Sequence, residues 1–170
     1  MEKEELLQVF DDNKNILNES IERSKKMELS NNKNFMMILI FIENNGKFLI
    51  QKTSKEKGSK YATTGGHVTF KDNGFTTCKK EIKEELNITL DDNDIQYIDT
   101  MKYKNCFVEI YYSNKIINKN EIKLQNEEVE NIYWMNEKEI INLIEKEQFR
   151  KGNIEPFKMV LEYKKNIRQI

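Results

Sequence analysis

Three glutamates stand close together in one short stretch of this 170-residue chain. Glu81, Glu84 and Glu85 are spaced i, i+3 and i+4, so on a helix their side chains share one face. Like charges at this spacing repel one another and cost stability. A divalent cation would offset the repulsion, because Mg²⁺ and Mn²⁺ are hard ions that prefer oxygen ligands. The spacing therefore favours a metal site.

A structural interpretation of the same helix is also open. Lys80 lies four residues before Glu84, so the charges can also form a solvated face of weak ion pairs, each worth about 0.3–0.5 kcal/mol. The helix alone does not decide between the two. Gly65 and Gly66 lie one predicted loop upstream, where glycine permits a close approach of backbone to ligand. A carbonyl of that loop would add a further oxygen ligand.

The composition excludes several other classes of function. The net charge is −1, so no basic surface indicates binding to a nucleic acid duplex or a membrane. One histidine and two separated cysteines, Cys78 and Cys106, cannot supply a conventional zinc site. The longest apolar run, Phe35 to Ile42, falls far short of the roughly 20 residues that cross a bilayer. With no secretory signal, a cytoplasmic protein is expected.

The glutamate helix is expected to run from Gly74 to Leu86. The side chains of Phe75, Cys78 and Ile82 recur at helical spacing, which predicts an amphipathic helix with Cys78 packed in the core. Asn87 stands where a left-handed residue commonly ends a helix.

Other patterns predict the elements that position this helix. An Asn-Gly turn between two apolar runs is a strong hairpin signal. An asparagine followed three residues later by a glutamate predicts a helix start, and a proline marks another. Strands before, between and after helices predict a layered α/β domain. The expected strands are 6–10, 16–24, 35–43, 48–52, 95–103, 106–113 and 130–134, with a linker over 30–34, a loop over 53–66, and helices over 136–148 and from about Pro156.

Taken together, residues 66–88 resemble the Nudix box. That motif runs Gly, five residues, Glu, seven residues, and then Arg-Glu-hydrophobic-X-Glu-Glu-X-Gly-hydrophobic. The spacing is met throughout, and the overall layout is similar to Nudix proteins related to isopentenyl-diphosphate isomerase, so the resemblance covers most of the chain. The motif's metal-facing glutamates are Glu81, Glu84 and Glu85, while Asp72, Lys80 and Asn87 replace its Glu, Arg and Gly.

The three departures are physically conservative. Asp72 and Lys80 preserve an acid–base pair, although lysine lacks the bidentate fork of arginine. Asn87 tolerates the left-handed conformation that ends the helix.

The resemblance implies an α/β fold, a Nudix-type α/β/α sandwich with a mixed β-sheet. An N-terminal β-hairpin and linker would occupy residues 1–33, and the Nudix domain residues 34–170. The implied activity is divalent-metal-dependent hydrolysis, with Mg²⁺ or Mn²⁺ as cofactor. Water would attack phosphorus in a diphosphate bond of a nucleoside diphosphate linked to another moiety. The partner is then a small-molecule diphosphate, and we expect a monomer or homodimer.

The resemblance also implies roles for single residues. The proton would go to a metal-facing glutamate, such as Glu84 or Glu85, or to a distal glutamate, for which Glu128 or Glu127 is the candidate. Gly66 and His67 are expected on the substrate side, although a lone loop histidine is equally well explained by a structural hydrogen bond. The metal ligands would be Glu81, Glu84, Glu85 and the carbonyl of Gly65.

Two rival functions remain to be weighed. A non-catalytic Nudix domain that binds a nucleotide or a partner is one, because Asp72 is a methylene shorter than glutamate and a misplaced site loses rate. Isopentenyl-diphosphate isomerase is the other, but it uses a cysteine where Gly65 stands and several histidines for its metal. Substrate choice is expected to lie in the segments 53–64 and 151–156.

Overall fold

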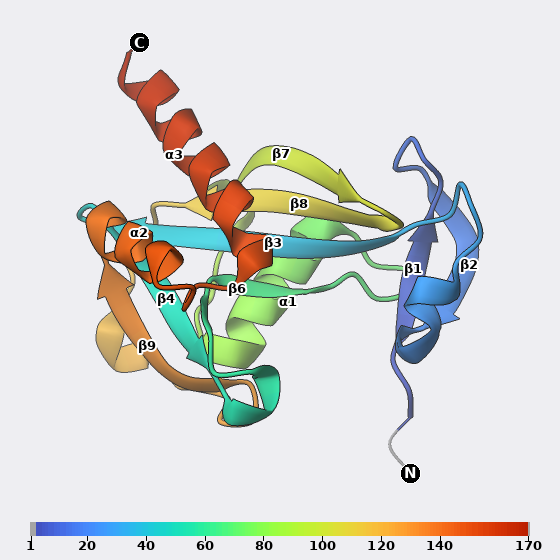
Figure 1. Cartoon of the computed structure of the whole chain (residues 1–170), viewed down its shortest axis with the longest axis horizontal. Helices are drawn as coiled ribbons and strands as arrows, with labels where there is room; N and C mark the ends of the chain where they lie inside the picture. Colours follow the sequence, from blue (N-terminus) through green and yellow to red (C-terminus); the bar gives the residue numbers. More distant parts are fainter. Residues whose placement is uncertain (1–2, 170) are drawn as a thin grey trace.

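The computed structural model describes residues 3–169 as a central sheet with helices on both faces and a β-hairpin at one end (Figure 1). Within those residues, no helix has the length and apolar character needed to cross a membrane. The strands are β1 (Leu6–Phe10), β2 (Ile16–Glu22), β3 (Phe35–Asn44), β4 (Lys47–Thr53), β5 (Tyr61–Ala62), β6 (Thr64–His67), β7 (Gln96–Tyr103), β8 (Cys106–Ser113) and β9 (Val129–Met135), and the helices are α1 (Gly74–Leu86), α2 (Glu137–Glu145) and α3 (Ile154–Arg168).

The sheet is mixed and is built around β3. On one side β3 pairs in parallel with β8, which pairs in turn with antiparallel β7. On the other side β3 pairs antiparallel with β6 along Met37–Ile40 and with β4 only at the Asn44 end. β4 then continues the sheet through antiparallel pairs with β5 and β9. The strands β6 and β4 thus pair with different parts of β3 and diverge from each other.

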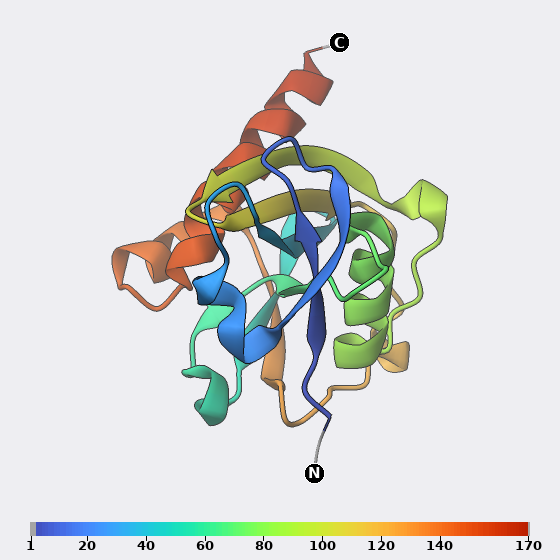
Figure 2. The same ribbon diagram turned by 90° about the vertical axis from the view of Figure 1, so that its right-hand side faces the viewer.

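Alternate side chains of β3 enter two separate cores. Met36, Ile38 and Ile40 pack with residues of α1, whereas Leu39 and Phe41 pack with residues of α2 and α3. This alternation follows from the two-residue period of a strand. Figures 1 and 2 show α1 and α3 on opposite sides of β3. The expected α/β/α sandwich with a mixed sheet is therefore confirmed.

Most of the predicted elements are confirmed with close bounds. α1 runs from Gly74 to Leu86, with Asn73 as its N-cap and Asn87 ending it at φ 58°. Cys78 is fully buried, and burial raises the pKa of its thiol. Asn136 caps α2 as predicted, but that helix ends at Glu145 rather than near residue 148.

Two segments differ from the sequence prediction. Residues 53–66 are not one loop, because they form a short 3₁₀ helix (Lys55–Lys57) and the strands β5 and β6. The strand β6 could not be predicted from the alternation of polar and apolar side chains, because its two central residues are glycines. A 3₁₀ helix, η1 (Arg23–Glu28), follows β2 ahead of the linker.

The N-terminal hairpin packs on the rest of its own chain. Leu7, Val9 and Phe10 of β1 are buried, and the backbones of Phe10 and Asn34 exchange two hydrogen bonds of 2.8 Å. The backbone N–H of Gln8 also donates a hydrogen bond to the backbone carbonyl of Val68. These contacts hold η1 beside β6. The division of the chain at residue 33 stays a prediction.

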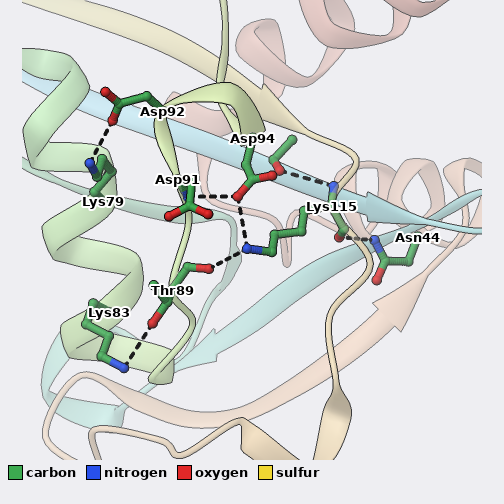
Figure 3. Close-up of polar contacts among 9 residues, drawn as sticks. Asn44, Lys79, Lys83, Thr89, Asp91, Asp92, Asp94 and Lys115 are labelled. Atoms are coloured by element: carbon green, nitrogen blue, oxygen red, sulfur yellow. Dashed lines mark hydrogen bonds and ion pairs between the residues drawn. The ribbon is translucent and has the colours of Figure 1, made fainter.

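The segment after α1 is fixed by paired charges (Figure 3). The Lys115 Nζ donates to Asp94 Oδ2 at 2.9 Å and to the Thr89 carbonyl at 3.0 Å. Lys79 of α1 donates to Asp92 at 2.7 Å. The aspartates of this segment are thus paired with lysines, and these pairs stabilise the connection from α1 to β7.

A buried ion pair joins α3 to the end of β3. Lys164 Nζ lies 2.5 Å from Glu43 Oε2, and the Tyr112 hydroxyl donates to the same oxygen at 3.1 Å. The side chains are only 15% and 8% exposed. The pair is therefore far better shielded than the exposed pair between Lys158 and Glu155 on the same helix.

We expect Lys164→Met to lower the free energy of unfolding by roughly 1.5–3 kcal/mol, because it leaves the carboxylate of Glu43 buried with only a hydroxyl partner. Lys158→Met should change it by less than about 1 kcal/mol, since that pair is exposed. Urea unfolding of the parent and both variants checks this. Equal effects of the two substitutions would contradict it.

Candidate active site

The glutamate face of α1 lies directly against the glycine strand β6. A Cβ placed on Gly66 would lie 2.3 Å from Cδ of Glu81, and one placed on Gly65 would lie 2.8 Å from the Ile38 carbonyl oxygen. Any side chain at either position would therefore collide with its neighbour. The two glycines admit the glutamates and β3 at close range. They belong to the strand β6, not to the loop expected from the sequence.

Two of the three helix glutamates are withdrawn from water. Burial raises the pKa of Glu81 to about 8, and the nearby charges of Glu85 and Glu84 add to the rise. Burial also raises the pKa of Glu85 to about 7, opposed by a 2.7 Å hydrogen bond that Gln51 Nε2 donates to its Oε2. Both carboxylates thus resist ionisation until a positive charge arrives.

The third glutamate, Glu84, is exposed on the same helix. Across residues 3–169, no three Asp, Glu, His or Cys side chains are already gathered as a metal site. The donor set nevertheless fits a hard divalent ion, because Glu81 and Glu85 offer neighbouring, desolvated oxygens whose charges a cation would neutralise. The Glu84 ligand role and the Gly65 carbonyl role stay predictions.

A cleft of about 320 Å³ opens in front of Glu85. It lies where β4 and β6 diverge, and both glycines of β6 contribute to its wall. Acidic and basic side chains face each other across it, an arrangement suited to a metal ion and a phosphate together. The charged groups that line it are Glu85, Glu128, Arg23, Lys57 and Arg150.

The basic residues come from separate parts of the chain. Arg23 belongs to η1 of the N-terminal hairpin, and Lys57 to the 3₁₀ helix after β4. The Arg150 guanidinium donates to the Lys57 carbonyl at 3.0 Å, which fixes it at the rim. The fold thus converges three cations on one cleft.

Of the two distal glutamates considered from the sequence, Glu128 lines the cleft. Its Oε1 lies 3.3 Å from Lys57 Nζ. Glu127 is exposed, and its backbone carbonyl accepts a hydrogen bond from Ser54. The geometry therefore favours Glu128 as the distal carboxylate, and its catalytic role stays a prediction.

His67 is held in place by the N-terminal segment. Its Nε2 lies 2.8 Å from Lys26 Nζ, and its ring stacks on Phe35 with centroids 5.9 Å apart. Burial, followed by the charges of Lys26 and Arg23, lowers the pKa of His67 to about 3. The imidazole is therefore neutral, and its Nε2 accepts a hydrogen bond from the Lys26 ammonium group. The structural hydrogen bond considered for this residue is therefore observed, while contact with substrate stays a prediction.

Two of the three altered box positions, Asp72 and Lys80, do not form the pairs predicted from the sequence. Asp72 accepts hydrogen bonds from the Asn73 amide and the Thr76 hydroxyl at the start of α1. In the part of the chain that the structure describes, Lys80 forms no ion pair with Asp72 or Glu84. The predictions of both pairs are wrong, because Asp72 is engaged at the helix start and exposed Lys80 stays hydrated.

Sequence reasoning missed Gln51, Arg23 and Arg150. Gln51 is 3% exposed in the apolar strand β4, and a polar residue within such a run was a usable signal. Arg23 and Arg150 carried no local signal, since their role depends on tertiary placement alone.

The family model described as NUDIX domain matches residues 33–157. The chain belongs to the NUDIX domain family. The matched range contains the whole resembled box, so the family expected from the sequence is confirmed. No curated protein shows significant sequence similarity to the chain.

Solved structures share this Nudix fold. DR0079 from Deinococcus radiodurans superposes with a TM-score of 0.70 at 15% identity, covering 88% of this chain and 94% of that one. A C. elegans Ap4A hydrolase superposes with a TM-score of 0.56 at 16% identity, covering 79% of this chain and 99% of that one. A bifunctional NMN adenylyltransferase/ADP ribose pyrophosphatase from Francisella tularensis gives 0.63 at 14% identity, covering 76% of this chain and 42% of that one. At these identities the likeness concerns the fold alone.

The raised pKa of Glu81 predicts a pH-dependent stability. Its folded value of about 8 exceeds the ordinary value of 4.5, so the metal-free folded state holds a proton that the unfolded state releases. Stability from this group is present below pH 4.5 and is lost as the pH rises toward 8. We expect Glu81→Gln to stabilise the metal-free protein at pH 8 by at least about 1 kcal/mol, and by less at pH 5.

Unfolding in the presence of a chelator at both pH values checks this prediction. The exposed Glu162, on α3, provides the matched control, and Glu162→Gln should leave stability nearly unchanged at either pH. A Glu81→Gln protein that is less stable than the parent at pH 8 would refute the account of a strained carboxylate.

Proposed function

We propose that this Nudix protein is a divalent-metal-dependent hydrolase of a diphosphate bond in a nucleoside diphosphate linked to another moiety. One observation carries the proposal: desolvated Glu81 and Glu85 lie on the same face of α1, Glu81 against Gly66 of β6 and Glu85 in the wall of a cleft lined with cations. Such an arrangement weakens the fold unless a cation and an anionic ligand complete it. Mg²⁺ or Mn²⁺ with a diphosphate supplies both.

The carboxylates of α1 would hold the metal. Glu81 and Glu85 are its best-placed ligands, with exposed Glu84 at the solvent side and the Gly65 carbonyl nearby. When bound, the ion neutralises phosphate charge and lowers the pKa of coordinated water. Gln51 orients Glu85 through its 2.7 Å hydrogen bond, as outer-shell partners of metal ligands commonly do.

The remaining charged residues of the cleft would bind the substrate phosphate and accept the proton of the attacking water. Arg23, Lys57 and Arg150 offer the charge that a second phosphate requires, and arginine suits phosphate oxygens because its planar fork binds them in pairs. Glu128 would accept the proton of the attacking water, since it lines the cleft and lies outside the α1 cluster. Its Oε1 lies 3.3 Å from Lys57 Nζ, which holds the side chain at the cleft wall.

A non-catalytic Nudix domain that binds a nucleotide is the second candidate. The observation that favours it is that Asp72 and Lys80, both within the described residues, form no ion pair, so this interaction does not stabilise the segment of the box before the metal-facing glutamates. Binding without turnover would then be expected. The retained carboxylates and the charged cleft favour catalysis.

We expect Glu85→Gln to lower kcat/KM for Mg²⁺- or Mn²⁺-dependent hydrolysis by roughly 100-fold or more, because it removes a metal ligand but preserves its shape. The fold should be intact, since an amide oxygen can still accept from Gln51. Formation of the nucleoside monophosphate product from a panel of nucleoside diphosphate derivatives, followed by ion-exchange chromatography, measures this.

Glu162→Gln, at an exposed site on α3, is the matched control and should retain full activity. If the parent hydrolyses none of the panel with either metal but still binds it, the second candidate is correct. If Glu85→Gln keeps parental activity, the assignment of the site is wrong.

A further inference from the structure

A second hollow, of about 570 Å³, lies beside the charged cleft. It is bounded by η1, by the first residues of β3, by β7 and β8, and by the start of α3. We call it the apolar groove. Its apolar wall is made by Met27, Phe35, Met37, Met101, Tyr103 and Val108.

The apolar groove and the charged cleft are adjacent. Met37, Val108 and Gly152 line both of them. A ligand whose diphosphate lies near Glu85 would therefore need to extend only past these residues to reach the groove. The group attached to the diphosphate would come to rest on the apolar side chains.

The lining is suited to a flat apolar group. Three methionine side chains are flexible and polarisable, and they make favourable contacts with aromatic rings. Tyr103 presents a ring that is 68% exposed, and Met27 is 62% exposed. The Asn105 amide, which also lines the groove, already donates to the backbone carbonyls of Ser30 and Lys33.

The charged side chains that line the groove are Lys26, which is already hydrogen-bonded to His67, and Lys104, Lys151 and Glu155. Their long, flexible stems are poorly suited to hold the edge of a base in one fixed geometry.

We propose that the apolar groove binds the nucleobase of the substrate and accepts different bases with little discrimination. This inference rests on the proposed function. Every base has a π face that an aromatic side chain can stack on, whereas selection among bases needs hydrogen bonds to their edges. The groove supplies the former through the exposed ring of Tyr103 and little of the latter.

A second copy of the chain fits the groove less well. Lys26, Lys104 and Lys151 also line it. A symmetric dimer formed across this surface would bring the same lysines together, and like charges in an interface are costly. A nucleotide would instead place its phosphates among cations.

Equilibrium binding tests the proposal without depending on turnover. Calorimetry with Ca²⁺ would compare ADP, GDP, CDP and UDP with ribose 5-diphosphate, which lacks a base. We expect the parent to bind the four nucleotides within about threefold of one another, and at least about tenfold more tightly than ribose 5-diphosphate. Tyr103→Ala and Met27→Ala should each weaken ADP binding, about five- to tenfold for Tyr103→Ala, and leave ribose 5-diphosphate unchanged.

Ile116→Ala, at a side chain 70% exposed and away from the groove, is the matched control and should bind like the parent. Base-dependent binding without any hydrolysis would support the groove while rejecting the hydrolase. Equal affinity for ADP and ribose 5-diphosphate would overturn the groove and leave the hydrolase standing. Equal losses for both ligands in Tyr103→Ala, or a change of oligomeric state on sizing columns, would also overturn it.

Discussion

The desolvation of two carboxylates, half-buried Glu81 and buried Glu85, where α1 meets β6 is the constraint on which the rest of the site depends. Desolvation raises the pKa of both groups. The charges of Glu85 and Glu84 add to the rise at Glu81, and those of Glu128 and Glu84 add to the rise at Glu85. Glycine at position 66 leaves the space that the Glu81 carboxyl group occupies, since a Cβ there would overlap it and displace the Glu81 side chain. The fold therefore carries a strained pair of acids that a divalent cation would relieve.

The surrounding architecture places positive charge opposite this pair. β3 supports both cores, and its early divergence from β4 leaves room for β6 and for the cleft. The N-terminal hairpin contributes Arg23 to the cleft and Lys26 to His67, so it forms part of the site wall. Its packing on β3 and on the segment after β6 explains how a segment outside the matched NUDIX range shapes the active site.

Local signals were sufficient for much of the fold and for the acidic half of the site. The bounds of α1, its Asn73 cap aside, and the Asn-Gly hairpin followed from periodicity and turn chemistry. The glutamate spacing pointed to Glu81, Glu84 and Glu85, of which Glu84 is exposed. The strand β6 was missed because Gly65 and Gly66 have no side-chain pattern. The basic half of the cleft depends on contacts between distant segments, and the pairing of Lys80 was mispredicted because hydration of an exposed lysine outweighs a weak ion pair.

Direct titration of the purified protein with Mn²⁺ at pH 8, following free Mn²⁺ by electron paramagnetic resonance, tests the central claim most closely. The account predicts saturable binding in the parent that is strongly weakened in Glu81→Gln and Glu85→Gln. It also predicts that Mn²⁺ raises the Tm of the parent more than that of either variant. Parental Mn²⁺ affinity in both variants, or no saturable binding in the parent, would contradict the claim that these buried carboxylates exist to hold a metal.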